Sequence, residues 1–239
     1  MSGNRKPYTD RTIERPKEKP WYKSLLSSNG AAEESGPIDY PSAEKVFQEE
    51  EPLLHYHIIH RGLVKTGNTK SSKDILLDIK GPGELIERNL SKEGKMERIV
   101  FAQTVTPAQL IPIRTATFFR YMEKEFWFSK EILGQLEAET SFLFNLKTLS
   151  QGIGMRAQLP FLLNQLWRKW EKARRGKKEG RIPPLPLSQM DLAKFLGVSR
   201  ETVFFYLKDL REREIVKANH EGIEVKDKEG LREIFEGFI

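Results

Sequence analysis

The sequence of 239 residues contains no cysteine. This absence excludes disulfide bonds, zinc sites built from thiolates and iron–sulfur clusters held by thiolates. No apolar run approaches the roughly 20 residues that a membrane-spanning helix requires. The polar N-terminus, MSGNRKPYTD, also lacks an apolar export signal. Together these absences predict a cytoplasmic protein without a membrane partner.

Catalytic signatures are missing as well. The sequence has no P-loop, no dinucleotide fingerprint and no evident Ser/His/Asp set, so we expect no enzyme. The net charge is +6, which suits a polyanionic partner but also simple solubility. Eight of the fourteen residues from 168 to 181 are Lys or Arg. This cluster predicts either a solvated helix end or a contact with phosphates.

The chain divides into four parts by composition and periodicity. Residues 1–41 form a polar lead-in, partly disordered, in which WYKSLL is one candidate short helix. Residues 42–128 alternate short apolar segments with turn signals, and residues 129–158 form a long helix and a hinge. Residues 159–239 form a second helical domain. Strands are expected in the first domain at LLHYHII, GLVKT, DILLDI, ERIVFAQTV and AQLIPI.

The long helix has a wide apolar arc. Four residues at helical spacing mark its proposed dimerisation side: Ile132, Leu136, Leu143 and Leu146. So wide an arc has more apolar surface than we expect a single β-domain to cover, and a second copy of the helix is expected to bury the rest. Gly152 and Gly154 weaken the end of this helix, and Pro160 is well placed to begin the next one.

The stretch from Ser188 to Leu210 predicts two short helices joined by a tight corner. SQMD at Ser188 resembles a capping box, Gly197 suits a turn with positive φ, and Ser199 can cap the second helix. This pattern is typical of a helix-turn-helix. Two short strands around NHEG then predict a wing, and a last helix is expected from about residue 227 to 238.

The second of these helices places polar residues opposite its buried side. Arg200 can bind guanine O6 and N7, Glu201 can accept from cytosine N4, and Phe204 can touch a thymine methyl group. We predict DNA binding by Ser188, Gln189, Ser199, Arg200, Glu201, Thr202, Phe204 and Lys208. The alternatives are a helical hairpin whose Arg and Glu form a surface pair, or a winged helix that contacts only protein.

The tract VSRETV and the order of the domains resemble the Crp/Fnr family of bacterial transcription regulators. The resemblance implies an α+β fold with an N-terminal cyclic-nucleotide-binding-like β-roll (a double-stranded β-helix), a long dimerisation helix and a C-terminal winged helix-turn-helix. It further implies a homodimeric, sequence-specific regulator on an inverted-repeat operator, with RNA polymerase as another candidate partner. Arg200 and Glu201 match the family's base-reading pair, but Phe205 occupies the place of its next base-reading arginine.

The family's nucleotide-binding motif is degenerate in this sequence. The resemblance suggests an effector site at Gly83, Glu84, Arg98 and Ile99, with Glu84 on a ribose and Arg98 on a phosphate. Ile99 stands where a hydroxyl residue would assist, and Lys147-Thr148 replaces the adjacent hydroxyls of the cAMP-binding members. We therefore expect Arg98 and Glu84 to form a retained salt bridge. A resident cofactor is not expected. We expect either an effector that is a small molecule other than cAMP or no effector.

Three of the four histidines lie in the segment HYHIIH. His55 and His57 are two residues apart and face one side of a strand, as metal ligands do in cupin-type barrels. Two alternatives follow: a metal- or haem-sensing regulator through His55, His57 and His60, or, less favoured, a cupin-like metalloenzyme. Ordinary strand surface is the interpretation we prefer, with no metal bound.

Overall fold

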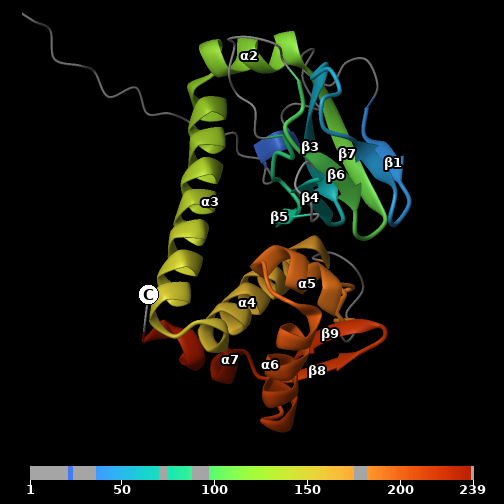
Figure 1. The fold of residues 1–239 in the computed structure, drawn as a ribbon. Helices are drawn as coiled ribbons and strands as arrows, with labels where there is room; N and C mark the ends of the chain where they lie inside the picture. The colour runs from blue at the N-terminus through green and yellow to red at the C-terminus, as the bar shows by residue number, and fades with distance from the viewer. Residues whose placement is uncertain (1–20, 24–35, 70–74, 88–96, 175–181, 238–239) are drawn as a thin grey trace, which may run out of the picture.

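A computed structural model describes residues 21–23, 36–69, 75–87, 97–174 and 182–237. The β-domain and the C-terminal helical domain lie on the same side of one long helix, which runs along both (Figure 1). The mixed α and β architecture therefore agrees with the fold expected from the sequence. Within the described ranges, no helix is long and apolar enough to cross a membrane.

The N-terminal domain is a roll of two antiparallel sheets. Along the strands, apolar side chains point inward and alternate with more exposed ones. Residues such as Ile59, Val64 and Leu110 fill the space between the two sheets. One sheet has the order β1 (Ile38–Tyr40), β7 (Ala108–Arg114), β3 (His55–Arg61). The other has the order β2 (Lys45–Phe47), β6 (Phe101–Thr104), β4 (Val64–Asn68), β5 (Ile75–Lys80).

The five predicted strands are all present, and two three-residue strands were missed. One of these, β1, lies inside the predicted polar lead-in and pairs with β7. The short helix η1 (Trp21–Lys23) coincides with the start of WYKSLL, and Tyr22 is buried against the roll. The rest of the lead-in, residues 1–20 and 24–35, lies outside the described residues.

Two helices follow the roll. The first, α2 (Thr115–Lys124), leads into α3 (Phe126–Gly152), which is the predicted long helix. Ile132 corrects the predicted dimerisation side: its side chain is 1% exposed and packs into the core beneath the roll together with Phe128. The adjacent Leu133 is 62% exposed instead. The apolar arc of α3 is wide because the side chains along one edge of it, such as Ile132, pack against the roll.

The hinge also differs from expectation. The chain turns at Gly154, whose φ is 71°, and α4 (Met155–Arg174) begins at once. Pro160 lies inside α4 and does not begin it. Pro160 lies in the second turn of α4, where it removes the hydrogen bond that a backbone N–H would donate to the carbonyl of Arg156.

The C-terminal domain contains α5 (Gln189–Leu196), α6 (Arg200–Glu212), the hairpin β8 (Val216–Asn219) and β9 (Gly222–Val225), and α7 (Lys228–Glu236). These elements are the predicted helix-turn-helix, wing and last helix. Their apolar core is continuous with Leu63, Leu76 and Ile79 of the roll, and β5, which carries Leu76 and Ile79, packs against α5. The C-terminal domain is thus docked on the roll, with α6 at the far end of the molecule (Figure 1).

Candidate nucleic-acid interface and effector site

Local capping interactions define both ends of α5 and the corner between α5 and α6. The hydroxyl of Ser188 accepts a hydrogen bond from the backbone N–H of Asp191, whose carboxylate accepts from the N–H of Ser188 in return. Gly197 ends α5 at φ 67°, a left-handed conformation that costs a residue with a Cβ about 1–2 kcal/mol. Ser199 then caps α6 by accepting from the N–H of Thr202. The predicted corner is confirmed at each of these positions.

The two faces of α6 separate by polarity. Val203, Leu207 and Leu210 are buried in the domain core. Arg200 and Glu201 are exposed at the start of the helix, as expected for side chains that reach base edges. A backbone hydrogen bond of Glu201 itself and the Ser199 hydroxyl lower the pKa of its carboxyl group. Glu201 is therefore an anion at neutral pH, the form that accepts hydrogen bonds only.

Three other predicted DNA-binding residues make contacts within the domain: Ser199, Thr202 and Lys208. The hydroxyls of Ser199 and Thr202 lie 3.0 Å apart at the helix start, so both are engaged in the cap. Lys208 forms an exposed i,i+4 ion pair with Glu212 at 3.6 Å. Such a pair is worth about 0.3–0.5 kcal/mol, so exchanging it for a phosphate costs little.

A groove of about 610 Å³ joins the start of α5 to the wing. Ser188, Gln189 and Arg200 line one part of it, and Asn219 and His220 at the tip of the wing line another. Three of the predicted DNA-binding residues therefore share one concave surface. The NHEG turn predicted from the sequence places Asn219 and His220 at the tip of the wing.

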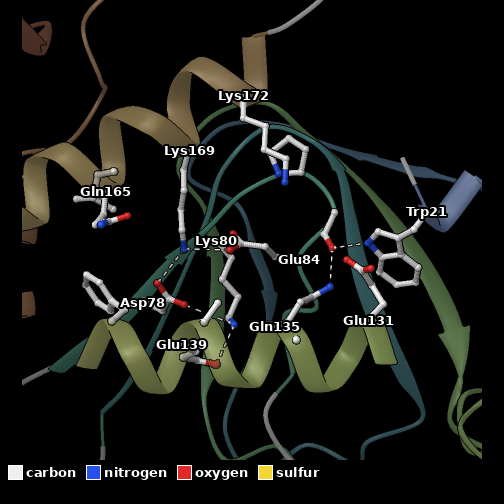
Figure 2. Close-up of a pocket in the computed structure, with 16 residues that line it drawn as sticks. Trp21, Asp78, Lys80, Glu84, Glu131, Gln135, Glu139, Gln165, Lys169 and Lys172 are labelled. Carbon is white, nitrogen blue, oxygen red and sulfur yellow. Dashed lines mark hydrogen bonds and ion pairs between the residues drawn. The ribbon is translucent and has the colours of Figure 1, made fainter. Parts of the chain in front are cut away.

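One lysine of the basic segment 168–181 faces the roll. Lys169, which lies on α4, points to the roll, where its ammonium group lies 3.2 Å from Glu84 and 3.4 Å from Asp78 (Figure 2). Burial lowers the pKa of Lys169, but Asp78 and Glu84 outweigh this effect and raise it overall. Lys169 is therefore committed inside the molecule and does not reach a phosphate in this conformation. Residues 175–181 of the segment lie outside the described residues.

A second ion pair also joins the domains. Lys65 on β4 lies 3.0 Å from Asp191, the same carboxylate that completes the capping box. Burial raises the pKa of Asp191, but hydrogen bonds from Ser188 and Lys65 lower it overall. The start of α5 is therefore tied to the roll through one residue of the helix-turn-helix.

Arg98 is the centre of a buried polar cluster in the roll. Its guanidinium lies 2.7 Å from Glu87, and Glu87 also lies 2.6 Å from Nδ1 of His57. All three residues are less than 9% exposed, and Arg98 also stacks over the Phe47 ring at 3.7 Å. Burial raises the pKa of Glu87, but His57 and Arg98 lower it overall. The cluster is thus a buried ion network, in which the Nε of Arg98 has no hydrogen-bond partner among the described residues.

The predicted salt bridge between Arg98 and Glu84 is wrong. Arg98 pairs with Glu87, whereas Glu84 pairs with Lys169 of α4. The four predicted effector residues are accordingly not gathered around one ligand position, and Ile99 is 51% exposed. Glu87 carries no motif signal in the sequence, because its pairing depends on how distant strands meet.

Gly83 and Glu84 line a different cavity, of about 340 Å³, between the roll, α3 and α4. Gln135 of α3 also lines this cavity (Figure 2). Its side chain donates to the carbonyl of Gly83 at 2.9 Å and accepts from the N–H of Leu85. Lys80 faces the same cavity and lies near both Asp78 and Glu139. Acidic and basic side chains alternate around this space, so it suits a polar ligand with both donors and acceptors.

The histidines do not converge. The rings of His55 and His57 lie near each other, with centroids 6.5 Å apart, but Nδ1 of His57 is bound to Glu87. His60 lies against Tyr22 instead, with ring centroids 5.6 Å apart. Burial and the neighbouring His57 and Arg98 lower the pKa of His55, so that its ring is neutral at neutral pH. Among the residues with described placement, no group of three or more His, Asp or Glu could hold a metal ion.

Comparison with known families decides the nature of the C-terminal domain. Residues 161–234 match the family model described as the Crp-like helix-turn-helix domain. The C-terminal part of this chain is a Crp-like helix-turn-helix domain. The match extends from α4 to α7, so the groove, the corner and α6 all lie within the Crp-like domain. No curated protein matches the chain in sequence.

Solved structures extend the likeness to the rest of the fold. FixK2 from Bradyrhizobium japonicum is 14% identical, with 83% of this chain and 96% of that one covered and a TM-score of 0.62. TTHA1359, a CRP/FNR-family transcriptional regulator from Thermus thermophilus, is 17% identical, with coverage of 85% and 100% and a TM-score of 0.63.

TTHB099, a CRP-family transcriptional regulator from the same organism, is also 17% identical, with coverage of 83% and 96% and a TM-score of 0.65. Since these matches span both domains, the arrangement of roll, long helix and Crp-like domain is the fold of these proteins. The predicted resemblance to Crp/Fnr regulators is confirmed.

Proposed function

We propose that the protein is a transcription regulator that binds DNA in a sequence-specific manner through α6. The observation that carries this proposal is the position of Arg200 and Glu201. Both are exposed at the start of α6, beside a groove that also contains Ser188, Gln189 and the tip of the wing. A helix-turn-helix places this part of its second helix in the major groove.

The side chains on this surface have complementary tasks. Arg200 carries a planar fork of donors for O6 and N7 of guanine, and the Glu201 carboxylate accepts from N4 of cytosine. Ser188 and Gln189 lie at the N-terminus of α5, where backbone N–H groups favour a phosphate. Lys208 can exchange its weak pair with Glu212 for a second phosphate.

The acting form is proposed to be a homodimer joined along α3. An exposed apolar stripe follows this helix: Phe126, Leu133, Leu143 and Phe144 are between 46% and 68% exposed, and the half-buried Leu136 lies among them. Leu133, Leu136 and Leu143 are separated by three and then seven residues, as the core positions of a heptad repeat in a two-stranded coiled coil are. A second α3 covers such a stripe, and two α6 helices about 34 Å apart then fit an inverted repeat.

The dimer has a direct test. Leu133→Lys places a charge in the stripe without disturbing the roll, because this side chain is 62% exposed. Sedimentation should show a dimer for the natural protein and for the control Leu133→Met, and a monomer for Leu133→Lys. An unchanged dimer in Leu133→Lys would reject the α3 interface.

Regulation is proposed to be independent of cAMP and of a resident cofactor. Arg98, the residue that would hold the cyclic phosphate, is already bound by Glu87. An effector, where one acts, is a polar small molecule in the cavity of Gly83, Glu84 and Lys169, where it would compete with an ion pair between the two domains. No enzymatic activity is proposed.

Selection of bound sequences from random duplex DNA tests the main proposal. The selection is run with and without a panel of cyclic nucleotides, other small metabolites and divalent metals. An enriched inverted repeat, unchanged by cAMP, is the expected result. Failure to enrich any sequence under all of these conditions would overturn the proposed function.

A further inference from the structure

Two phenylalanines lie exposed in the middle of α6. Phe204 is 48% exposed and Phe205 is 65% exposed. Phe205 follows Glu201 by four residues, and Lys208 follows Phe205 by three, so the three side chains share one face. That face is opposite the buried stripe of Val203 and Leu207. The phenyl rings therefore stand where α6 presents its surface to a partner.

The ring of Phe205 has an aromatic neighbour, and Phe204 lies between two cationic residues along the helix. The ring of Phe205 rests edge-on against Tyr206, with centroids 5.3 Å apart and planes at 88°, and Tyr206 is itself packed against the domain core. Phe204 has cationic neighbours one turn away on each side, Arg200 and Lys208. An apolar centre between two cations fits a surface whose edges are phosphates and whose middle is less polar.

The chemistry of a phenyl ring limits what it can recognise. Phenylalanine neither donates nor accepts a conventional hydrogen bond, so it cannot read the donors and acceptors that distinguish most base edges. In the major groove, the apolar group on the natural base pairs is the C5-methyl of thymine. Removing a methyl-sized apolar surface from water is worth about 0.8 kcal/mol, roughly a fourfold change in affinity.

We propose that Phe204 and Phe205 read thymine C5-methyl groups in the centre of each half-site. This inference rests on the proposed function and deepens it by naming the base that follows the pair read by Arg200 and Glu201. Specificity along α6 is then divided: hydrogen bonds act at the N-terminal end and apolar contact acts in the middle. The half-site thus contains T·A pairs where an arginine at position 205 would select G·C.

The test replaces thymine by deoxyuridine, one position at a time, in the sequence obtained by selection. Uracil keeps every hydrogen-bonding group of thymine and lacks only the methyl group. At one or two positions per half-site, we expect binding of the natural protein to weaken about fourfold. Replacement at the equivalent positions of both half-sites doubles the free-energy cost and gives about a 15-fold loss, since each methyl contributes about 0.8 kcal/mol.

The phenylalanine variants show which ring makes each contact. Phe205→Ala and Phe204→Ala should each abolish the thymine-to-uracil difference at one position, and Phe205→Leu, which keeps an apolar side chain, should retain most of it. Phe205→Arg should shift the selected base pair at that position from T·A to G·C. Both side chains are substantially exposed, so folding of the variants can be verified by circular dichroism before binding is measured.

The outcomes distinguish failure of the proposed DNA-binding function from failure of thymine reading by Phe204 and Phe205. If no duplex sequence is preferred over scrambled DNA, the proposed function fails. If a sequence is preferred but uracil equals thymine at every position, the function stands and this inference is overturned. A uracil effect that persists unchanged in both alanine variants would also overturn it, because the methyl groups would then be read by other residues.

Discussion

The resemblance to the Crp/Fnr family suggests ligand contacts for two arginines of this chain, and the structure places these two side chains in opposite surroundings. Arg98 in the roll is 8% exposed and bound to Glu87. Arg200 at the start of α6 is exposed beside a groove. The residue type is retained in both places, but only Arg200 presents its guanidinium to solvent. A motif therefore shows which chemistry a chain carries, and the partners of each side chain decide whether that chemistry is available.

The largest expected effect comes from breaking the internal network. Arg98→Ala leaves the buried Glu87 carboxylate without its guanidinium and should lower the free energy of unfolding by about 3–5 kcal/mol. The control Arg232→Ala breaks exposed ion pairs with Glu229 and Glu236 and should have a far smaller effect on stability. Urea unfolding measures both. Equal losses would show that Arg98 is not a structural residue.

Acid should reveal the same network without mutating Arg98. Burial raises the pKa of Glu87, but His57 and Arg98 lower it overall. Because the folded pKa lies below the unfolded value, the carboxylate adds stability above about pH 4.3, and this stability is lost as the pH falls through the folded pKa. Stability measured from pH 6 down to pH 3 should therefore fall less steeply in Glu87→Gln than in the natural protein. Parallel curves would contradict the assignment.

In the helix-turn-helix, a mutation can test backbone conformation where the Arg98 mutation tests a buried charge. Gly197→Ala should cost about 1–2 kcal/mol, since φ is 67° and no atom lies near the new Cβ to add a clash. Gly237→Ala is the matched control, because its φ is −69° and its Cβ also meets open space. The control should change stability by less than about 0.5 kcal/mol. Thermal unfolding of the two variants at equal protein concentration compares them.

The smallest expected effect concerns the capping box. Ser188→Ala removes the acceptor for the Asp191 N–H and should cost about 1 kcal/mol. Ser141→Ala on the exposed side of α3 is the control and should be close to neutral. If Ser188→Ala proved neutral in chemical unfolding, the stabilising role assigned to the capping box at the start of α5 would be wrong.

Local signals explain why the C-terminal domain was predictable. Ser188, Gly197 and Ser199 act within three or four residues of themselves, so their spacing alone predicts two caps and a corner. The long helix was also evident from its periodicity. By contrast, β1 and β2 have three residues each, too few to show alternation, and they acquire their pairing from β7 and β6.

The errors concern contacts between distant parts of the chain. Glu84 and Glu87 are three residues apart, and nothing in the sequence indicates that Glu87 meets Arg98 while Glu84 meets Lys169 of the other domain. Ile132 and Leu133 are adjacent on an apolar arc, and the docking of α3 on the roll decides which of them is buried. Periodicity defines a face, but the neighbour that covers it follows from the tertiary structure.

The most direct test of the DNA-binding claim is the ratio of affinities for the selected duplex and for a scrambled duplex at the same salt concentration. For the natural protein we expect a ratio of at least about 10³. Arg200→Ala should lose about 1–3 kcal/mol on the selected duplex, about 5- to 150-fold, and leave binding to scrambled DNA nearly unchanged. An equal loss on both duplexes would contradict base reading by Arg200 and, with it, the role assigned to α6.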